Sequence, residues 1–69
     1  MNLTINGTTS EIPDGLTVAG LLEYQKVKMP DMVSVERNGE ILPRQEFPST
    51  RLAEGDQIEF LYFMGGGSR

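Results

Sequence analysis

Two asparagine-glycine pairs constrain the fold of this chain more than any other feature. Both central positions of a tight two-residue hairpin turn need a positive φ angle, which Asn and Gly adopt readily. Asn6-Gly7 follows residues 1–5, where apolar and polar side chains alternate, and precedes a Thr- and Ser-rich return segment at 8–12. Asn38-Gly39 is a second pair of the same kind. The sequence therefore predicts two antiparallel hairpins, well separated along the chain.

A short helix is predicted between the two hairpins, over residues 18–26. Three apolar side chains at the i, i+3 and i+4 positions share one helical face: Val18, Leu21 and Leu22. Thr17 is placed to cap the first turn with its hydroxyl group. Met29-Pro30 marks the far limit, because a proline disfavours helical backbone at the residue before it.

The second half of the chain supplies the remaining elements. The predicted strands cover residues 32–37, 40–42 and 57–64, with an irregular stretch at 44–50 and a turn at Glu54-Gly55-Asp56. Phe47 is expected to anchor the irregular stretch to the core. The simplest packing is an α+β domain, a small mixed sheet of four to five strands with one helix across one face. We expect this domain to cover residues 1–64, followed by a flexible glycine-rich tail at 65–69.

The composition limits what chemistry the chain can perform by itself. Its 69 residues contain neither cysteine nor histidine. Disulfides, cysteine-bound zinc and a histidine general base are therefore excluded. A domain this small also has little room for a deep pocket. We expect a carrier or binding module without catalytic residues, with no metal and no bound cofactor. Glu54 and Asp56 are interpreted as turn residues, because two carboxylates without further ligands are weak evidence for a metal site.

The net charge indicates which kinds of partner the chain can bind. Six basic and ten acidic residues give a net charge of −4. This balance disfavours nucleic acid and anionic membranes, and suits docking to a protein with a basic groove. We expect a cytoplasmic protein, because neither a signal peptide nor a membrane-length apolar run is evident. Arg44 and Arg51 are interpreted as solvent-exposed arginines.

Three stretches together resemble one known family. Residues 38–44 read N-G-E-I-L-P-R, residues 52–59 read L-A-E-G-D-Q-I-E, and Gly65, Gly66 and Gly67 follow near the end. The chain resembles the ThiS sulfur carriers of thiamine biosynthesis over nearly its whole length. The resemblance implies a β-grasp, or ubiquitin-like, fold.

The resemblance also implies a function. Gly67 would be the attachment point of the adenylate and then of the thiocarboxylate, and the tail Gly65, Gly66 and Gly67 would thread into the partner. An E1-like adenylyltransferase of the ThiF type would use ATP to activate the carboxylate. A thiazole synthase of the ThiG type would receive the sulfur. Glycine suits such a tail because it has no side chain to clash in a narrow channel.

This chain departs from the family pattern at its end, where Ser68-Arg69 follow Gly67. We expect a protease to remove these two residues. Two alternatives remain open. One is a processed sulfur carrier for cysteine, methionine or molybdopterin synthesis, and the other is a non-covalent ubiquitin-like interaction module.

The last predicted strand is apolar on both faces near its end. Ile58, Phe60, Tyr62 and Met64 have one parity, and Leu61 and Phe63 have the other. If the core takes the first set, Leu61 and Phe63 would form a docking surface for the activating enzyme. If the strand twists strongly, both sets would find apolar cover instead.

Overall fold

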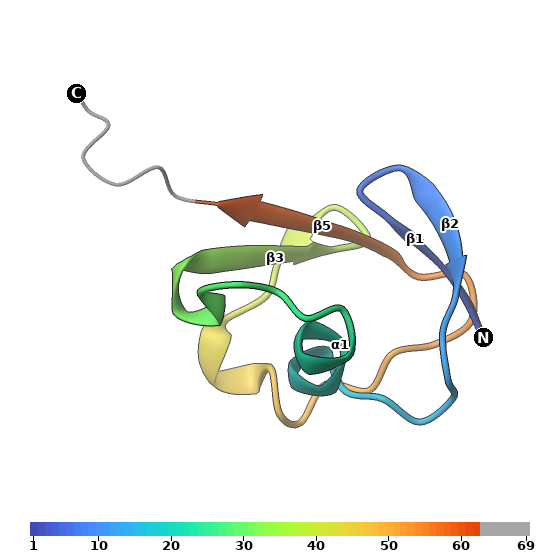
Figure 1. The fold of residues 1–69 in the computed structure, drawn as a ribbon, viewed down its shortest axis with the longest axis horizontal. Helices are drawn as coiled ribbons and strands as arrows, with labels where there is room; N and C mark the ends of the chain where they lie inside the picture. The colour runs from blue at the N-terminus through green and yellow to red at the C-terminus, as the bar shows by residue number, and fades with distance from the viewer. Residues whose placement is uncertain (63–69) are drawn as a thin grey trace.

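A computed structural model of the chain describes residues 1–62, and these form a mixed sheet with one helix (Figure 1). The elements, in chain order, are β1 (Asn2–Ile5), β2 (Thr8–Glu11), α1 (Val18–Tyr24), the 3₁₀ turn η1 (Pro30–Met32), β3 (Val33–Arg37), β4 (Glu40–Ile41), the 3₁₀ turn η2 (Arg44–Glu46) and β5 (Gln57–Tyr62). The α+β prediction of one helix on a small sheet is confirmed.

The five strands lie in the order β2-β1-β5-β3-β4. Both asparagine-glycine turns are present, with φ angles of 50° and 84° at Asn6 and Gly7 and of 54° and 87° at Asn38 and Gly39. The two hairpins they close are antiparallel, and β5 lies between them, parallel to β1 and antiparallel to β3. The last strand is therefore the central strand of the sheet, as Figure 1 shows.

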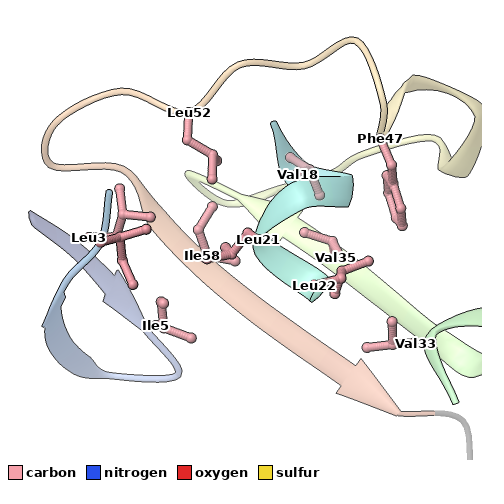
Figure 2. Packing of buried hydrophobic residues seen from close by; sticks show 11 residues of the cluster. Leu3, Ile5, Val18, Leu21, Leu22, Val33, Val35, Phe47, Leu52 and Ile58 are labelled. Atoms are coloured by element: carbon pink, nitrogen blue, oxygen red, sulfur yellow. The ribbon is translucent and has the colours of Figure 1, made fainter. Parts of the chain in front are cut away.

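The hydrophobic core lies between the sheet and α1 (Figure 2). Leu21 on the helix faces Ile58 on β5, and both are fully buried. Phe47 is 5% exposed and closes the core beside the helix, as the sequence predicts. Thr17 caps α1 as expected, because its Oγ1 accepts a hydrogen bond of 3.1 Å from the amide of Gly20. Eleven buried apolar residues make up this cluster, and they come from β1, α1, β3, β5 and the loops between the elements.

Several element boundaries differ from the prediction, each for a local reason. The helix ends at Tyr24, because Lys26 adopts a left-handed φ of 54°. Met32 belongs to η1 and not to the third strand. β4 ends before Leu42, and the next residue is Pro43, which has no amide to continue a ladder. The predicted end of the last strand, at Phe63 and Met64, lies outside the described residues.

The expected solvent exposure of Arg44 is confirmed, but its guanidinium group also makes contacts within the domain that the sequence does not indicate. It donates hydrogen bonds to the carbonyl groups of Pro30 and Val33, at 2.9 and 2.6 Å, and lies 5.4 Å from the centre of the Phe47 ring. Arg44 therefore joins η1 and the start of β3 to η2.

Candidate functional site

The strand β5 presents two chemically different faces. Residues directly opposite each other on neighbouring strands point to the same side of a sheet. Phe60 pairs with Val35, which is fully buried, so this parity faces the core. Leu61 pairs with Ser34, and Glu59 pairs with Glu36. These four side chains therefore lie on the side of the sheet that faces away from α1.

Near the end of β5 this outer face carries an apolar patch. Leu61 is 42% exposed and Ile41, on the neighbouring hairpin, is 59% exposed. Together with Ser34 and with the adjoining Tyr62, whose parity is that of Phe60, they line a shallow hollow of about 220 Å³. We call these four residues the outer hollow. The expected exposure of Leu61 is confirmed, whereas its role in docking stays a prediction.

The other predicted site residues lie outside the described part of the chain. Phe63, Gly65, Gly66 and Gly67 all follow Tyr62, as do Ser68 and Arg69. Their proposed roles therefore rest on the sequence. The structure shows that β5 is the element leading toward them, and that the outer hollow lies at the end of this strand.

The beginning of β5 is held by a buried carboxylate. Asp56 is 7% exposed. Its Oδ2 accepts hydrogen bonds from the amide of Ala53 at 2.9 Å and from Nε of Arg37 at 3.0 Å, and its Oδ1 accepts one from Nδ2 of Asn38 at 3.1 Å. The Asn38 side chain also accepts a hydrogen bond from the amide of Gln57 at 2.9 Å. We call Asp56, Arg37, Asn38 and Ala53 the Asp56 cluster.

The electrostatics of this cluster favour the charged form of Asp56. Burial by itself raises the pKa of the carboxyl group, because the charged form loses water. The hydrogen bonds from Ala53, Asn38 and Arg37, together with the positive charge of Arg37, outweigh burial and lower the pKa below its ordinary value. Asp56 is therefore a structural anion that ties the second hairpin turn to the entrance of β5.

Sequence reasoning missed two features of this region. Asp56 was interpreted as a turn residue, and it does follow the turn at Gly55, but it is also the centre of a buried network. The sequence does carry a signal for this network, because Asp56 lies two residues before the apolar Ile58 of the last predicted strand. A carboxylate so close to a buried strand must find hydrogen-bond partners. Ile41 was assigned to a strand without a role. Its cross-strand pairing with Glu36 places it on the outer face, and that pairing is not visible in the sequence.

A second, larger hollow of about 700 Å³ lies beside α1, η1 and η2. Its lining mixes apolar residues such as Phe47 and Val27 with both signs of charge, from Glu23, Lys26 and Arg44. Among residues 1–62 there is no group of three or more acidic side chains placed to hold a metal ion. None of the helices in this part of the chain is long and apolar enough to cross a membrane.

The order of the elements and the mixed sheet β2-β1-β5-β3-β4 with one helix across one face define a β-grasp, or ubiquitin-like, domain. Comparison with known proteins narrows this class. The sequence profile of the ThiS family matches residues 3–67, and the chain belongs to this family. The resemblance seen in the sequence is therefore confirmed.

Three relatives illustrate the family. The crystal structure of a thiamine biosynthesis protein (ThiS) from Geobacter metallireducens is 49% identical to this chain, with a TM-score of 0.87, and the match covers 97% of this chain and 100% of that one. A thiazole synthase from Paramagnetospirillum magneticum is 38% identical over 68 residues, which are 99% of this chain and 21% of the relative. A thiazole synthase from Magnetococcus marinus is 37% identical over 67 residues, 97% of this chain and 20% of the relative. The chain thus spans about a fifth of the length of these two synthases.

Proposed function

We propose that this protein is a sulfur carrier for the synthesis of the thiamine thiazole ring, and that it carries the sulfur as a thiocarboxylate on Gly67. The observation that carries the proposal is the extent of the family match. It runs from residue 3 to residue 67, so it includes the whole glycine run and stops at the glycine expected to react. The chain supplies the acyl group and has no catalytic residue of its own.

The chemistry explains why such a carrier needs a partner. A carboxylate is a poor electrophile, so the free carboxylate of Gly67 first attacks the α-phosphorus of ATP and releases pyrophosphate. The resulting acyl-adenylate has a good leaving group. A sulfur nucleophile then attacks the carbonyl carbon, AMP departs, and a thiocarboxylate remains. ATP is bound by the activating enzyme, an E1-like adenylyltransferase of the ThiF type, and not by this chain.

The two residues after Gly67 must be removed before this reaction. Ser68-Arg69 hold the Gly67 carbonyl in a peptide bond, which cannot attack ATP as a carboxylate does. A protease would hydrolyse the Gly67-Ser68 bond and leave the required carboxylate. In this proposal the Gly67 carboxylate becomes available only after this cleavage.

The thiazole synthase relatives support the choice of pathway. Two proteins named thiazole synthase contain a region similar to this chain, as about a fifth of their length. Joining two domains in one polypeptide raises their effective concentration for each other, which is useful if one delivers its product to the other. We infer that this chain delivers sulfur to a thiazole synthase of the ThiG type.

The end of β5 is the proposed contact with the activating enzyme. Leu61 and the rest of the outer hollow offer apolar surface beside the segment that must enter the partner, and Phe63 has the same parity as Leu61. Leu61→Asp should lower kcat/KM for adenylation by about tenfold or more, as loss of a central apolar contact does. The circular dichroism spectrum should stay unchanged. Unfolding of this variant would instead assign Leu61 to the core.

The chemistry itself is tested with three forms of the chain, ending at residues 66, 67 and 69. Each is incubated with the ThiF-type enzyme, ATP and a sulfide source, and its intact mass is measured. We expect only the form ending at Gly67 to gain the mass difference of one oxygen replaced by sulfur. The form ending at 66 is the matched control for the position of the carboxylate. If the form ending at 67 is never adenylated, the protein is a non-covalent module.

The pathway is tested with the thiocarboxylate form. It is presented to a thiazole synthase in one reaction, and to a sulfhydrylase or a molybdopterin synthase catalytic subunit in others. We expect loss of sulfur only with the thiazole synthase. Transfer to another acceptor alone would assign the carrier to that pathway.

A further inference from the structure

Two glutamates lie directly opposite each other in the middle of the outer face. Glu36 on β3 and Glu59 on β5 are paired residues of the antiparallel ladder. Their side chains therefore leave the sheet on the same side, with Cβ atoms about 5 Å apart. Like charges in this arrangement destabilise a sheet.

The neighbouring residues do not compensate this repulsion. The other cross-strand neighbour of Glu36 is Ile41 on β4, and two residues from Glu59 along β5 is Leu61. Arg37, the adjacent basic residue in the sequence, belongs to the opposite parity and bonds Asp56 at 3.0 Å. Within residues 1–62, the ion pairs are those of Met1 with Asp14 and of Arg37 with Asp56. Neither of them includes Glu36 or Glu59.

Glu36 and Glu59 lie beside the outer hollow. Leu61 and Ser34 are themselves a cross-strand pair, and each is two residues from one of the glutamates. Two residues along a strand correspond to about 7 Å. The outer face therefore offers an apolar hollow and, about 7 Å away, two adjacent carboxylates.

We propose that Glu36 and Glu59 together recognise one cationic side chain on the activating enzyme, while an apolar side chain of the same enzyme occupies the outer hollow. This inference rests on the proposed function, because it names the chemistry of the partner surface. The occupant is a protein surface with an arginine about 7 Å from an apolar side chain. Arginine fits best because its planar fork of N–H donors can bind two carboxylates at once.

The proposal predicts opposite effects on stability and on binding when one of the two charges is changed. Neutralising or reversing one charge removes a repulsion from the free carrier and removes an attraction from the complex. A residue that served only the fold would change both properties in the same direction. Opposite signs are therefore the signature of this proposal.

The decisive variant is Glu36→Lys in the chain ending at Gly67. Lys at position 36 can pair with Glu59, so the Tm should rise by about 2–5 °C. At the same time kcat/KM for adenylation should fall by about tenfold or more, with a weaker dependence on salt. The double variant Glu36→Gln with Glu59→Gln should lower kcat/KM by about tenfold without a loss of Tm.

Glu23→Lys is the matched control. It makes the same change in net charge, but on α1, which covers the opposite side of the sheet. Its kcat/KM should stay within about twofold of the parent chain, since long-range steering by net charge alone is a smaller effect. An equal fall in Glu23→Lys and Glu36→Lys would overturn the local recognition proposed here.

The outcomes separate this inference from the function on which it rests. If the parent chain is adenylated and the Glu36 and Glu59 variants match it in kcat/KM, the inference is wrong and the sulfur-carrier proposal stands. If the parent chain neither binds nor is adenylated by the enzyme, both are wrong. A fall in kcat/KM that accompanies a fall in Tm would show that the two glutamates serve the fold and would also overturn the inference.

Discussion

The first and second halves of β5 lie in very different environments. The first half pairs with β1 through Gln57 and Ile58 and with β3 on its other side. Ile58 is fully buried, and the Asp56 cluster holds the entrance of the strand. In the second half, Leu61 and Tyr62 pair with β3 and are 42% and 48% exposed. One strand is thus a core element at its start and a surface element at its end.

The change from buried to exposed side chains along β5 occurs where the neighbouring strand β1 ends. β1 stops at Ile5 and the chain turns back at Asn6-Gly7. The Asn6 side chain then accepts a hydrogen bond of 2.9 Å from the amide of Phe60, in the place where a longer β1 would continue the ladder. The second half of β5 therefore pairs with β3 and not with β1, and the anchored first half holds it as a defined surface. This is the geometry that a carrier needs if its end must enter a partner.

The largest expected effect is on the free energy of unfolding, and it separates two apolar residues of β5. Ile58→Ala should lower the free energy of unfolding by about 2–5 kcal/mol, because it leaves a cavity in the small core. Leu61→Ala should lower it by less than about 1 kcal/mol, since this side chain lies at the surface. Urea denaturation followed by circular dichroism measures both. Equal losses in the two variants would contradict the difference between the halves.

Removing the Asp56 carboxylate should have the next largest effect. Asp56→Ala leaves the amide of Ala53 and the side chains of Arg37 and Asn38 without their acceptor. We expect a loss of about 2–4 kcal/mol in unfolding free energy. Glu40→Ala is the control, because Glu40 is exposed and lies in the β3–β4 hairpin that contributes Arg37 and Asn38 to the cluster. It should change stability by less than about 0.5 kcal/mol. A loss as small as that of the control would mean that the cluster adds little to the fold.

The lowered pKa of Asp56 predicts how stability depends on pH. The unfolded state binds a proton near the ordinary value of 3.8, and the folded state binds it only at lower pH. The stabilisation is therefore complete above the ordinary value and is lost as the pH falls through the lowered one. Asp56→Asn should flatten the acid limb of a Tm-against-pH curve below about pH 4. Parallel curves for the two proteins would assign the acid limb to other carboxylates.

The smallest expected effect on stability comes from the hydrogen bond between Asn6 and Phe60, where the two halves of β5 meet. Asn6→Gly keeps the positive φ of the turn but removes the acceptor for the Phe60 amide. We expect a loss of about 0.5–1 kcal/mol and faster hydrogen exchange at Phe60. Asn38→Gly is not an equivalent control, because Asn38 also bonds Asp56. Gly7→Ala, which strains the turn without touching the acceptor, should instead leave the exchange rate at Phe60 unchanged relative to its neighbours.

Much of the fold was predictable because its signals are local. The two Asn-Gly turns, the Thr17 cap and the i, i+3, i+4 spacing of Val18, Leu21 and Leu22 each depend on a few consecutive residues. Boundaries were less predictable: the left-handed conformation of Lys26 and the 3₁₀ turn at Pro30–Met32 have no comparable signal. Of the candidate site, the parity of Leu61 could be predicted, whereas Ile41 needed its strand partner to be known.

By itself the sequence determined the class of fold, the family and the expected reactive glycine, because short-range turn and helix chemistry and a continuous motif carry that information. Only the tertiary structure decided which residues oppose one another across the sheet. The pairing of Glu36 with Glu59, the hollow shared by Ile41 and Leu61 and the hydrogen bonds from Arg37 and Asn38 to Asp56 all join residues at least 18 positions apart. Such contacts depend on strand register, which is set by how the whole core packs and not by any one segment.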